Sequence, residues 1–282
     1  MKIKEISILL TIFFFIVSFG YAQDSTEPAI TMSFKPNGEV TIFIAGNPEA
    51  GSVVIDWGDG SPTHTHPLAH LKNMIYDDKV HAVSHTYSTT SDCIISITGK
   101  LITAIKVSSL GLTSLVLNTP LEYVVCEDNK LTSLDVSKSE RLFSLNCGKN
   151  QLTSLDVSNN IYLFILDFRN NQLSSIDVSK NGLLQFLTCS SNQLTSLNVS
   201  MNRNLITLDC NENQLTAEAI NALFVSLNAT NRASIDNLPK MIHIEGNPGT
   251  DACNKKIAES RSWKVISKYT DMNDFIKDYL KL

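Results

Sequence analysis

The sequence lacks an excess of positive charge. Its 282 residues contain 23 Lys and Arg against 28 Asp and Glu, which gives a formal net charge of −5 at pH 7. A protein that binds nucleic acid or an anionic membrane surface usually carries a basic patch and a positive balance. The mild acidity of this chain therefore argues against both kinds of partner.

Catalytic signatures are also missing from the sequence. It contains no G-x-S-x-G, H-E-x-x-H, P-loop or G-x-G-x-x-G motif, and these are the short patterns that place a nucleophile, a zinc ion or a phosphate. We therefore expect no enzyme activity and no cofactor.

Only one hydrophobic run is long, and it lies at the N-terminus. Two lysines precede apolar residues 6–19, and a small-x-small pattern ends at Ala22. The run is shorter than the roughly 20 residues of a membrane span, and polar sequence follows at once. We predict a signal peptide over 1–22 with cleavage after Ala22, no membrane span after its removal, and a secreted or cell-surface location.

The sequence is rich in repetition. From Leu121 to Leu215 the pattern L-x-x-[LV]-x-[CF]-x-x-N-x-L recurs with a step of 21 residues and no gaps. Repeats this short cannot bury an apolar face alone, so they must stack on their neighbours, which predicts a solenoid. We expect the repeated asparagines to turn inward and bond backbone groups as a ladder. They are Asn129, Asn150, Asn171, Asn192 and Asn213.

Most cysteines belong to this repeat. Cys126, Cys147, Cys189 and Cys210 share one column, and Phe168 occupies the same slot in the third line. Since Phe fills the slot as readily as Cys, the slot requires an apolar filler. The Cβ vectors of stacked residues run parallel, which disfavours disulfides. We predict buried free thiols that form part of the structural ladder.

Residues 23–100 have a different pattern, which predicts a small β-sandwich. Alternating runs without helical period indicate strands at 30–34, 40–44, 53–57, 80–87 and 93–98. The segment Asp56-Trp57-Gly58-Asp59-Gly60-Ser61, followed by His85-Thr86-Tyr87, resembles a PKD-type immunoglobulin-like domain. The resemblance implies an Ig-like fold for this segment only.

Acidic and histidine residues of this segment allow two interpretations. Asp56 and Asp59 suit calcium ligands or an acidic catalytic pair, but a D-x-G-D-G turn uses Asp for side-chain-to-backbone bonds and Gly for positive φ. His64 and His66 would share one strand face, yet a zinc site needs at least three converging ligands. The turn without a metal is favoured, and a hydrolase or metal-binding protein using this domain is the least favoured function.

The remaining boundaries follow from departures from the repeat. We assign the solenoid to 101–215, with an atypical first coil at 102–120 and regular coils from 121, and a C-terminal cap to 216–282. Within the cap the sequence predicts a helix over 216–227 with Thr216 as N-cap, the last repeat strand over 241–247, a short helix within 251–260, a strand over 263–266 and an amphipathic helix over 272–282.

The array over 102–247 resembles the leucine-rich repeat family, specifically the 21-residue cysteine-ladder type of internalin-J-like bacterial surface proteins. Together with the signal peptide and the PKD-like segment, it is similar to secreted or surface proteins of the Bacteroidetes group. The resemblance implies a mainly β fold: a leucine-rich repeat solenoid with short parallel strands and little helix, preceded by an Ig-like sandwich and closed by an α/β cap.

Function is expected in the columns that vary. Positions between core residues in the strand half should face the concave side, and we expect Tyr123, Ile165 and Phe186 to be exposed there beside charged side chains, a mixture typical of protein-binding patches. The candidate ligand-binding residues are Tyr123, Val125, Glu127, Ile165, Asp167, Arg169, Phe186, Asp209 and Asn211.

These features predict an exported, non-enzymatic binding protein that recognises a protein or a glycan at a cell surface, with adhesion as one such role. The alternative is a structural spacer or scaffold without a specific ligand. The sequence makes no prediction of oligomeric state.

Overall fold

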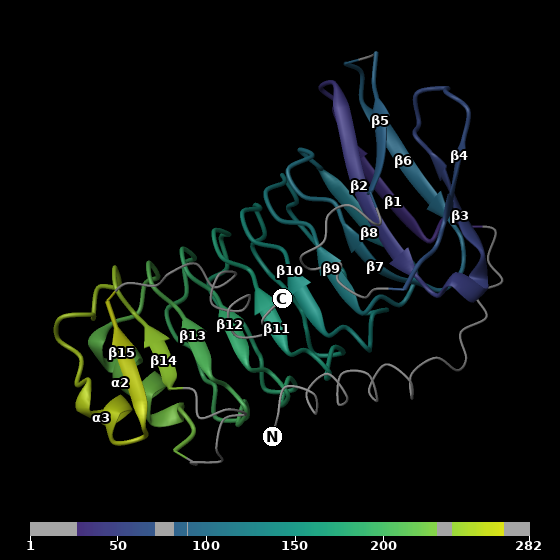
Figure 1. Cartoon of the computed structure of the whole chain (residues 1–282). Helices are drawn as coiled ribbons and strands as arrows, with labels where there is room; N and C mark the ends of the chain where they lie inside the picture. Colours follow the sequence, from purple (N-terminus) through teal and green to yellow (C-terminus); the bar gives the residue numbers. More distant parts are fainter. Residues whose placement is uncertain (1–26, 71–81, 89, 230–238, 268–282) are drawn as a thin grey trace.

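The computed structural model describes residues 27–70, 82–88, 90–229 and 239–267. Strands dominate, and the described helices are the short 3-10 turn Pro48–Ala50, α2 (Ala217–Ser226) and α3 (Lys256–Glu259). Figure 1 shows a two-sheet N-terminal part that leads into a row of stacked coils. The predicted mainly β solenoid with little helix is confirmed.

One N-terminal sheet is antiparallel throughout. Its spatial order is β4-β3-β6-β1-β8, with bounds β4 (His64–Pro67), β3 (Ser52–Asp56), β6 (Cys93–Thr98), β1 (Ile30–Phe34) and β8 (Ser114–Leu117). Strand β4 was not predicted, because its HTHP sequence has no apolar face. It is an edge strand, where pairing with β3 alone suffices to hold it.

A second sheet begins in the same N-terminal part and extends through the whole molecule. Its first strands are β5 (Ala82–Thr86), β2 (Glu39–Gly46) and β7 (Ile102–Lys106). Ile42 of this sheet and Ile55 and Ile95 of the first sheet are fully buried in one core. The two sheets are therefore held together by their inward-facing apolar side chains.

The first coil of the solenoid completes both sheets. Strand β7 pairs antiparallel with β2 on one side and parallel with β9 on the other, while β8, from the second half of the same coil, pairs antiparallel with β1. A single hydrophobic core consequently runs from Ala29 to Trp263. The sandwich and the solenoid share backbone hydrogen bonds as well as core, which makes the junction stiff.

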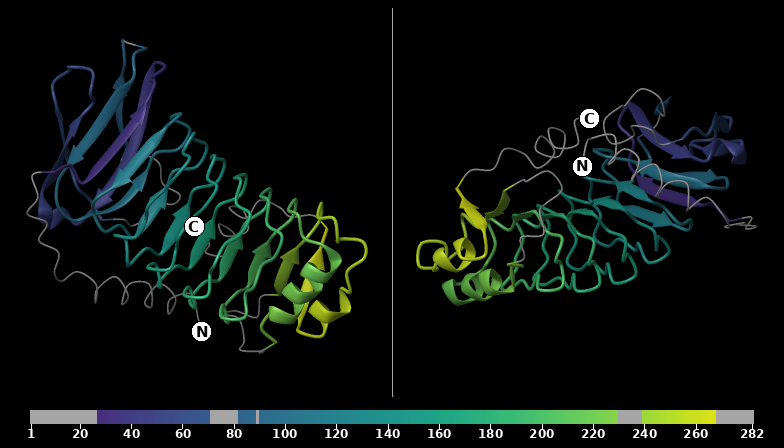
Figure 2. Two further views of the ribbon diagram at one scale, coloured as in Figure 1. Left: turned by 180° about the vertical axis from the view of Figure 1, so that it is seen from behind. Right: turned by 60° about the horizontal axis from the view of Figure 1, so that its bottom comes forward.

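The regular coils each contribute one short strand to a parallel sheet. These strands are β9 (Tyr123–Val125), β10 (Ser144–Asn146), β11 (Ile165–Asp167), β12 (Phe186–Thr188), β13 (Thr207–Asp209), β14 (Lys240–His243) and β15 (Trp263–Ile266). Leu145, Leu166 and Leu187, at the strand centres, pair in register and are fully buried. Because side chains alternate along a strand, the first and third residues of β9 to β13, and the second and fourth residues of β14 and β15, point to the opposite face, along the inner side of a shallow arc (Figure 2).

The C-terminal end carries the longer helix. Thr216 caps α2 by accepting a hydrogen bond from Ala219 N at 3.2 Å, and Ile220, Leu223 and Phe224 bury its apolar face against the last coils. Within the described parts of the chain, no helix has the length and apolarity to cross a membrane. The predicted signal peptide and the helix expected over 272–282 lie outside the described residues.

Candidate functional site

The repeated asparagines form hydrogen bonds that connect each coil to the one before it. Asn171 Oδ1 accepts from Leu152 N at 2.9 Å, and its Nδ2 donates to Cys147 O at 3.1 Å and Phe168 O at 3.0 Å. The same bonds recur at Asn129, Asn150, Asn192 and Asn213. Their fixed identity follows from this architecture, since a buried backbone group without a partner is costly.

A second ladder, not identified from the sequence, lies in the other half of the coils. Asn181 Nδ2 donates to Val157 O at 3.0 Å and to Asn160 O at 2.9 Å, and Asn160 and Asn202 repeat the arrangement. The sequence does contain a signal for this second ladder, because Asn160, Asn181 and Asn202 fall in one column of the 21-residue alignment, with Ser139 at the same position in the preceding coil. These ladders are structural, because the side-chain amides donate to backbone carbonyl groups of the preceding coil.

The aspartates of the second half serve local turns. Asp135, Asp156 and Asp177 each accept from the backbone N–H two residues later at 2.8–2.9 Å, and Asn198 does the same at 3.0 Å. Hydrogen bonds from the serine two residues on lower the pKa of the three carboxyls. The ladder therefore consists of Asx turns.

The column cysteines are buried and reduced. All six cysteines of the chain are free thiols, and Cys126, Cys147, Cys189 and Cys210 have no exposed surface. Burial raises the pKa of Cys126 to about 12 and that of the other three further above the usual range. A nucleophilic role would need an accessible thiolate, so these thiols are core fillers.

Hydrogen bonds and ring stacking hold the turn that follows β3. We call the cluster of Trp57, Asp59 and His85 the clamp. Asp56 Oδ1 accepts from Gly58 N at 2.9 Å, and Asp59 Oδ1 accepts from Ser61 N at 3.0 Å. Asp59 Oδ2 lies 2.8 Å from His85 Nε2, and hydrogen bonding to His85 holds the pKa of this carboxyl well below its usual range. Both aspartates thus make the side-chain-to-backbone hydrogen bonds expected of a D-x-G-D-G turn.

The aromatic neighbours of His85 complete this clamp. Its ring stacks on Trp57 with centroids 4.9 Å apart, and the Tyr87 hydroxyl donates to Trp57 O at 2.7 Å. Among the described residues, no three His, Cys, Asp or Glu side chains converge as metal ligands. The cluster thus joins the turn to the sheet.

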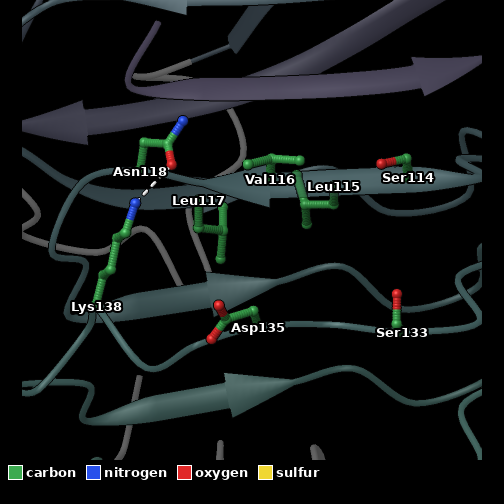
Figure 3. A pocket seen from close by; sticks show the side chains of 8 residues that line it. All are labelled: Ser114, Leu115, Val116, Leu117, Asn118, Ser133, Asp135 and Lys138. Atoms are coloured by element: carbon green, nitrogen blue, oxygen red, sulfur yellow. Dashed lines mark hydrogen bonds between the residues drawn. The ribbon is translucent and has the colours of Figure 1, made fainter. Parts of the chain in front are cut away.

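A shallow hollow lies between β8 and the next coil (Figure 3). Val116 and Leu117 line it together with Asp135, and Lys138 Nζ donates to Asn118 Oδ1 across it at 2.8 Å. The Lys138 ammonium is thus already used at its rim. We do not assign ligand binding to this hollow.

The face of the solenoid that carries the varying columns is the remaining candidate. We call the outward side chains of β11, β12 and β13 the concave strip; they are Ile165, Asp167, Phe186, Thr188, Thr207 and Asp209. Parallel register places them in two rows, Ile165-Phe186-Thr207 and Asp167-Thr188-Asp209. Of the other predicted site residues, Val125, Glu127, Arg169 and Asn211 flank the strip and are partly exposed.

The predicted exposure of three residues on this face is wrong. Tyr123 and Ile165 are only 6% and 7% exposed, and Phe186 is fully buried. One reason is lateral packing: the residue that precedes each strand places a further side chain beside this row. Strand alternation predicts the direction of a side chain and gives no information on what packs beside it.

Aromatic side chains supply much of this packing. The ring centroids are 5.6 Å apart for Tyr123 and Phe143, 4.9 Å for the stacked pair Phe143 and Phe164, and 5.7 Å for Phe164 and Phe186. We call these four residues the aromatic row. Phe143 and Phe164 are its partly exposed members, and both were missed because they lie one position before the strands.

Charges border the aromatic row. Arg169 binds Asp167 through Nε at 3.0 Å and a terminal guanidinium nitrogen at 2.7 Å. Burial raises the pKa of Asp167 to about 6, against the opposing effect of Arg169. On β13, two strands from Asp167, the Oδ1 atom of Asp209 lies 3.1 Å from Nδ1 of His243, which belongs to β14. The face therefore combines aromatic surface with oriented, partly buried charge.

Comparisons with known proteins show likeness at the level of structure only. No family model and no curated protein matches the chain. A functional domain of InlJ from Listeria monocytogenes, whose structure is described as including a cysteine ladder, aligns over 56% of this chain and 47% of its own, with 23% identity and a TM-score of 0.38.

Two further solved structures align similarly. The internalin inlF from Listeria monocytogenes has 24% identity over 54% of this chain and 42% of its own, with a TM-score of 0.44. A leucine-rich repeat protein from Leptospira interrogans has 22% identity over 54% of this chain and 38% of its own, with a TM-score of 0.41. The chain thus spans less than half the length of each of these proteins.

Proposed function

We propose that this protein is an exported binding protein that recognises a protein ligand with the concave side of its leucine-rich repeat solenoid. The aromatic row carries the proposal. Four aromatic side chains follow one another across neighbouring coils on the side where the sequence varies, whereas the buried columns keep one residue type for architectural reasons.

The chemistry of this face suits a protein partner. Aromatic and arginine side chains are enriched at the energetic centres of protein interfaces, because they bury large areas at low cost in conformational entropy. Phe143 and Phe164 supply partly exposed rings, and Arg169 supplies a guanidinium oriented by Asp167. A glycan would use the same aromatic surface for stacking and the flanking carboxylates for hydrogen bonds, and is an outcome that the experiment below distinguishes.

The proposal includes the finer assignments from the sequence. Residues 1–22 act as a signal peptide, the protein is secreted or held at the cell surface, and adhesion is one use of the binding face. Residues 23–100, which contribute most strands of the two N-terminal sheets, are a PKD-like, Ig-like domain, and 216–282 cap the solenoid. The clamp of Asp59, Trp57 and His85 supports the PKD-like assignment, since it joins the residues that carry that resemblance.

A structural spacer is the second candidate. The continuous core from Ala29 to Trp263 and the sheet shared between β2, β7 and β9 favour it, because a stiff rod suits a protein that holds other components apart.

Measurements of binding by variants that lack one ring or reverse one charge distinguish the binding function from the spacer function. Immobilised wild-type protein, Phe164→Ser and Arg169→Glu are compared for capture from host and community extracts, and the captured partner is then titrated against each. Binding through the concave side predicts at least tenfold weaker affinity for both variants. Lys180→Glu, an equal charge reversal at an exposed position in the other half of the coil, should bind as wild type does.

Unchanged affinity of folded Phe164→Ser and Arg169→Glu would reject the concave face as the binding site and leave the spacer function. Loss of capture after glycosidase treatment of the extract, with protein components intact, would identify a glycan as the ligand.

A further inference from the structure

Apolar side chains are exposed in the turns beside the aromatic row. Ile161, Tyr162 and Leu183 are 50%, 37% and 42% exposed, and they lie in the turns that precede β11 and β12. Large apolar residues scattered singly over a surface are ordinary, whereas a contiguous group marks an interaction surface. We call these three residues the rim.

Hydrogen bonds hold the turns of the rim side by side. Asn181 Nδ2 donates to Asn160 O at 2.9 Å, and Asn204 Nδ2 donates to Gly182 O at 2.8 Å. Tyr162 and Leu183 occupy the same position in consecutive coils, and neighbouring coils of a parallel ladder are about 4.8 Å apart. A surface that is held in this way loses little conformational entropy when it binds a partner.

The rim continues the aromatic row. Leu163 is fully buried, and its two chain neighbours, Tyr162 and Phe164, both lie at the surface. In the preceding coil, Arg141 and Phe143 are two residues apart and are both partly exposed. The apolar surface therefore extends from the concave side over the edge of the solenoid.

An arginine borders the rim at each end. Arg141 occupies the position of Tyr162 in the preceding coil, and Arg203 occupies the position of Ile161 two coils further on. Arg141 interacts with Glu122, and Arg203 is exposed. The two arginines are three coils apart, which is about 14 Å at the spacing of a parallel ladder.

We propose that the rim binds an extended segment of a partner protein in which apolar side chains lie between two carboxylates. An extended chain rises about 3.3 Å per residue, so carboxylates about four residues apart match the separation of Arg141 and Arg203. Guanidinium groups bind carboxylates through two parallel hydrogen bonds. Tyr162 and Leu183 supply the apolar contact between these two ends.

This inference rests on the proposed function, and it names the partner more closely. The rim and the aromatic row form one surface, so a ligand of the row continues over the edge, where its side chains are apolar and acidic. A glycan would gain little from the aliphatic Ile161 and Leu183. Ser158 and Lys180 precede the buried asparagines of the turns and lie outside this surface.

Peptide selection on the full chain tests the rim. Random peptides displayed on phage are selected on immobilised wild-type protein, and the enriched peptides are synthesised with a fluorescent label and titrated. We expect them to carry apolar residues flanked by Asp or Glu, and to bind Leu183→Asp and Arg203→Glu at least tenfold more weakly than wild type.

Matched controls separate loss of the rim from loss of the fold. Ile94→Asp introduces the same carboxylate at an exposed apolar position of an N-terminal sheet, and Lys180→Glu reverses a charge outside the rim. Both should bind the peptides as wild type does. Urea unfolding of each variant should give a midpoint close to that of wild type.

Charge exchange gives a result that a folding defect cannot produce. Each acidic residue of a selected peptide is replaced by lysine in turn. One such replacement should weaken binding to wild type and restore binding to Arg203→Glu, because it re-forms the ion pair with the charges exchanged.

Enriched peptides that are basic, or that bind Leu183→Asp as tightly as wild type, would overturn the proposal. A selection that enriches no peptide dependent on Leu183 would overturn it as well. A dimer that dissociates in Leu183→Asp, seen by sedimentation without peptide, would replace the partner with a second copy of this chain. Flotation with phosphatidylglycerol vesicles that Leu183→Asp abolishes would replace it with a lipid surface.

Failure of the rim and failure of the concave side are distinguishable. Leu183 and Arg203 decide whether the rim binds the selected peptides, and Phe164 and Arg169 decide whether the captured partner binds the concave side. Loss of binding in only one pair of variants rejects only the other surface.

Discussion

The side-chain nitrogen of Asn171 lies 3.1 Å from the backbone oxygen of Cys147 in the preceding coil. The same side chain accepts a hydrogen bond from Leu152 N at 2.9 Å, also in the preceding coil. One side-chain amide thus donates to a carbonyl group at the end of the strand segment and accepts from an N–H group in the turn that follows it. The repetition of this contact explains why asparagine is fixed at 21-residue intervals.

Replacing Asn171 with alanine should destabilise the protein by about 2 kcal/mol, since it leaves the buried Leu152 N without a partner and removes one of the two bonds to each of Cys147 O and Phe168 O, which keep Asn150 and Asn192. The bonds lost are those with Leu152 N, Cys147 O and Phe168 O. Urea unfolding gives the measurement, with the exposed Asn159→Ala as the matched control. A midpoint of unfolding equal to that of Asn159→Ala would show that the inward asparagine contributes little.

Thiol chemistry tests the role of the cysteine column. Cys126, Cys147, Cys189 and Cys210 should resist alkylation in the native protein at pH 8, because they have no exposed surface and their pKa values are raised by burial. Partly exposed Cys253 should react first. Mass spectrometry of native and urea-unfolded samples counts the modified thiols, and a disulfide between neighbouring column cysteines would refute the core-filler assignment.

The stability of the protein should depend on pH through Asp167. Its pKa is about 6 in the folded protein, above the 3.8 of an unperturbed aspartate, so the folded state binds more protons than the unfolded state between these values. Stability therefore falls as pH rises from 4 to 6, by up to about 3 kcal/mol for a shift of two units. Asp167→Asn should remove this slope in unfolding measured across the window.

Asp156 provides the control of opposite sign. Hydrogen bonds from Ser158 lower the pKa of this exposed carboxyl, so its contribution is present above pH 4 and is lost as pH falls further. Asp156→Asn should leave the slope between pH 4 and 6 as in wild type. A wild-type stability that is flat through that window would contradict the raised pKa of Asp167.

Export is tested by the processed N-terminus. Expression with the native leader in a bacterium that has a general secretion pathway should release a chain that begins at Gln23, as determined by N-terminal sequencing. Ala22→Leu removes the small residue at the cleavage position and should block processing. A cell-retained wild-type chain that begins at Met1 would reject the signal peptide.

The sequence predicts the repeating architecture well, because stacking imposes one residue type at each buried position. Asn171 and Cys147 each occupy such a position, and their columns indicated it. The pairing of β8 with β1 was not predictable, since it joins segments about 80 residues apart whose local patterns do not identify each other.

The concave side was predicted less well. Alternation placed Tyr123 and Phe186 on the correct face, but their burial depends on Phe143 and Phe164 from neighbouring coils. Such contacts are tertiary, and a strand pattern contains no information about them.

The central claim, that this face binds a protein partner, is tested most directly by site-specific photo-cross-linking on intact cells. A benzoylphenylalanine at position 164 lies within the aromatic row, and one at position 158 lies in the exposed turn of the other half of the coil. The account predicts a discrete protein adduct from position 164 and none from position 158. Adducts of equal yield from both positions, or from position 158 alone, would contradict it.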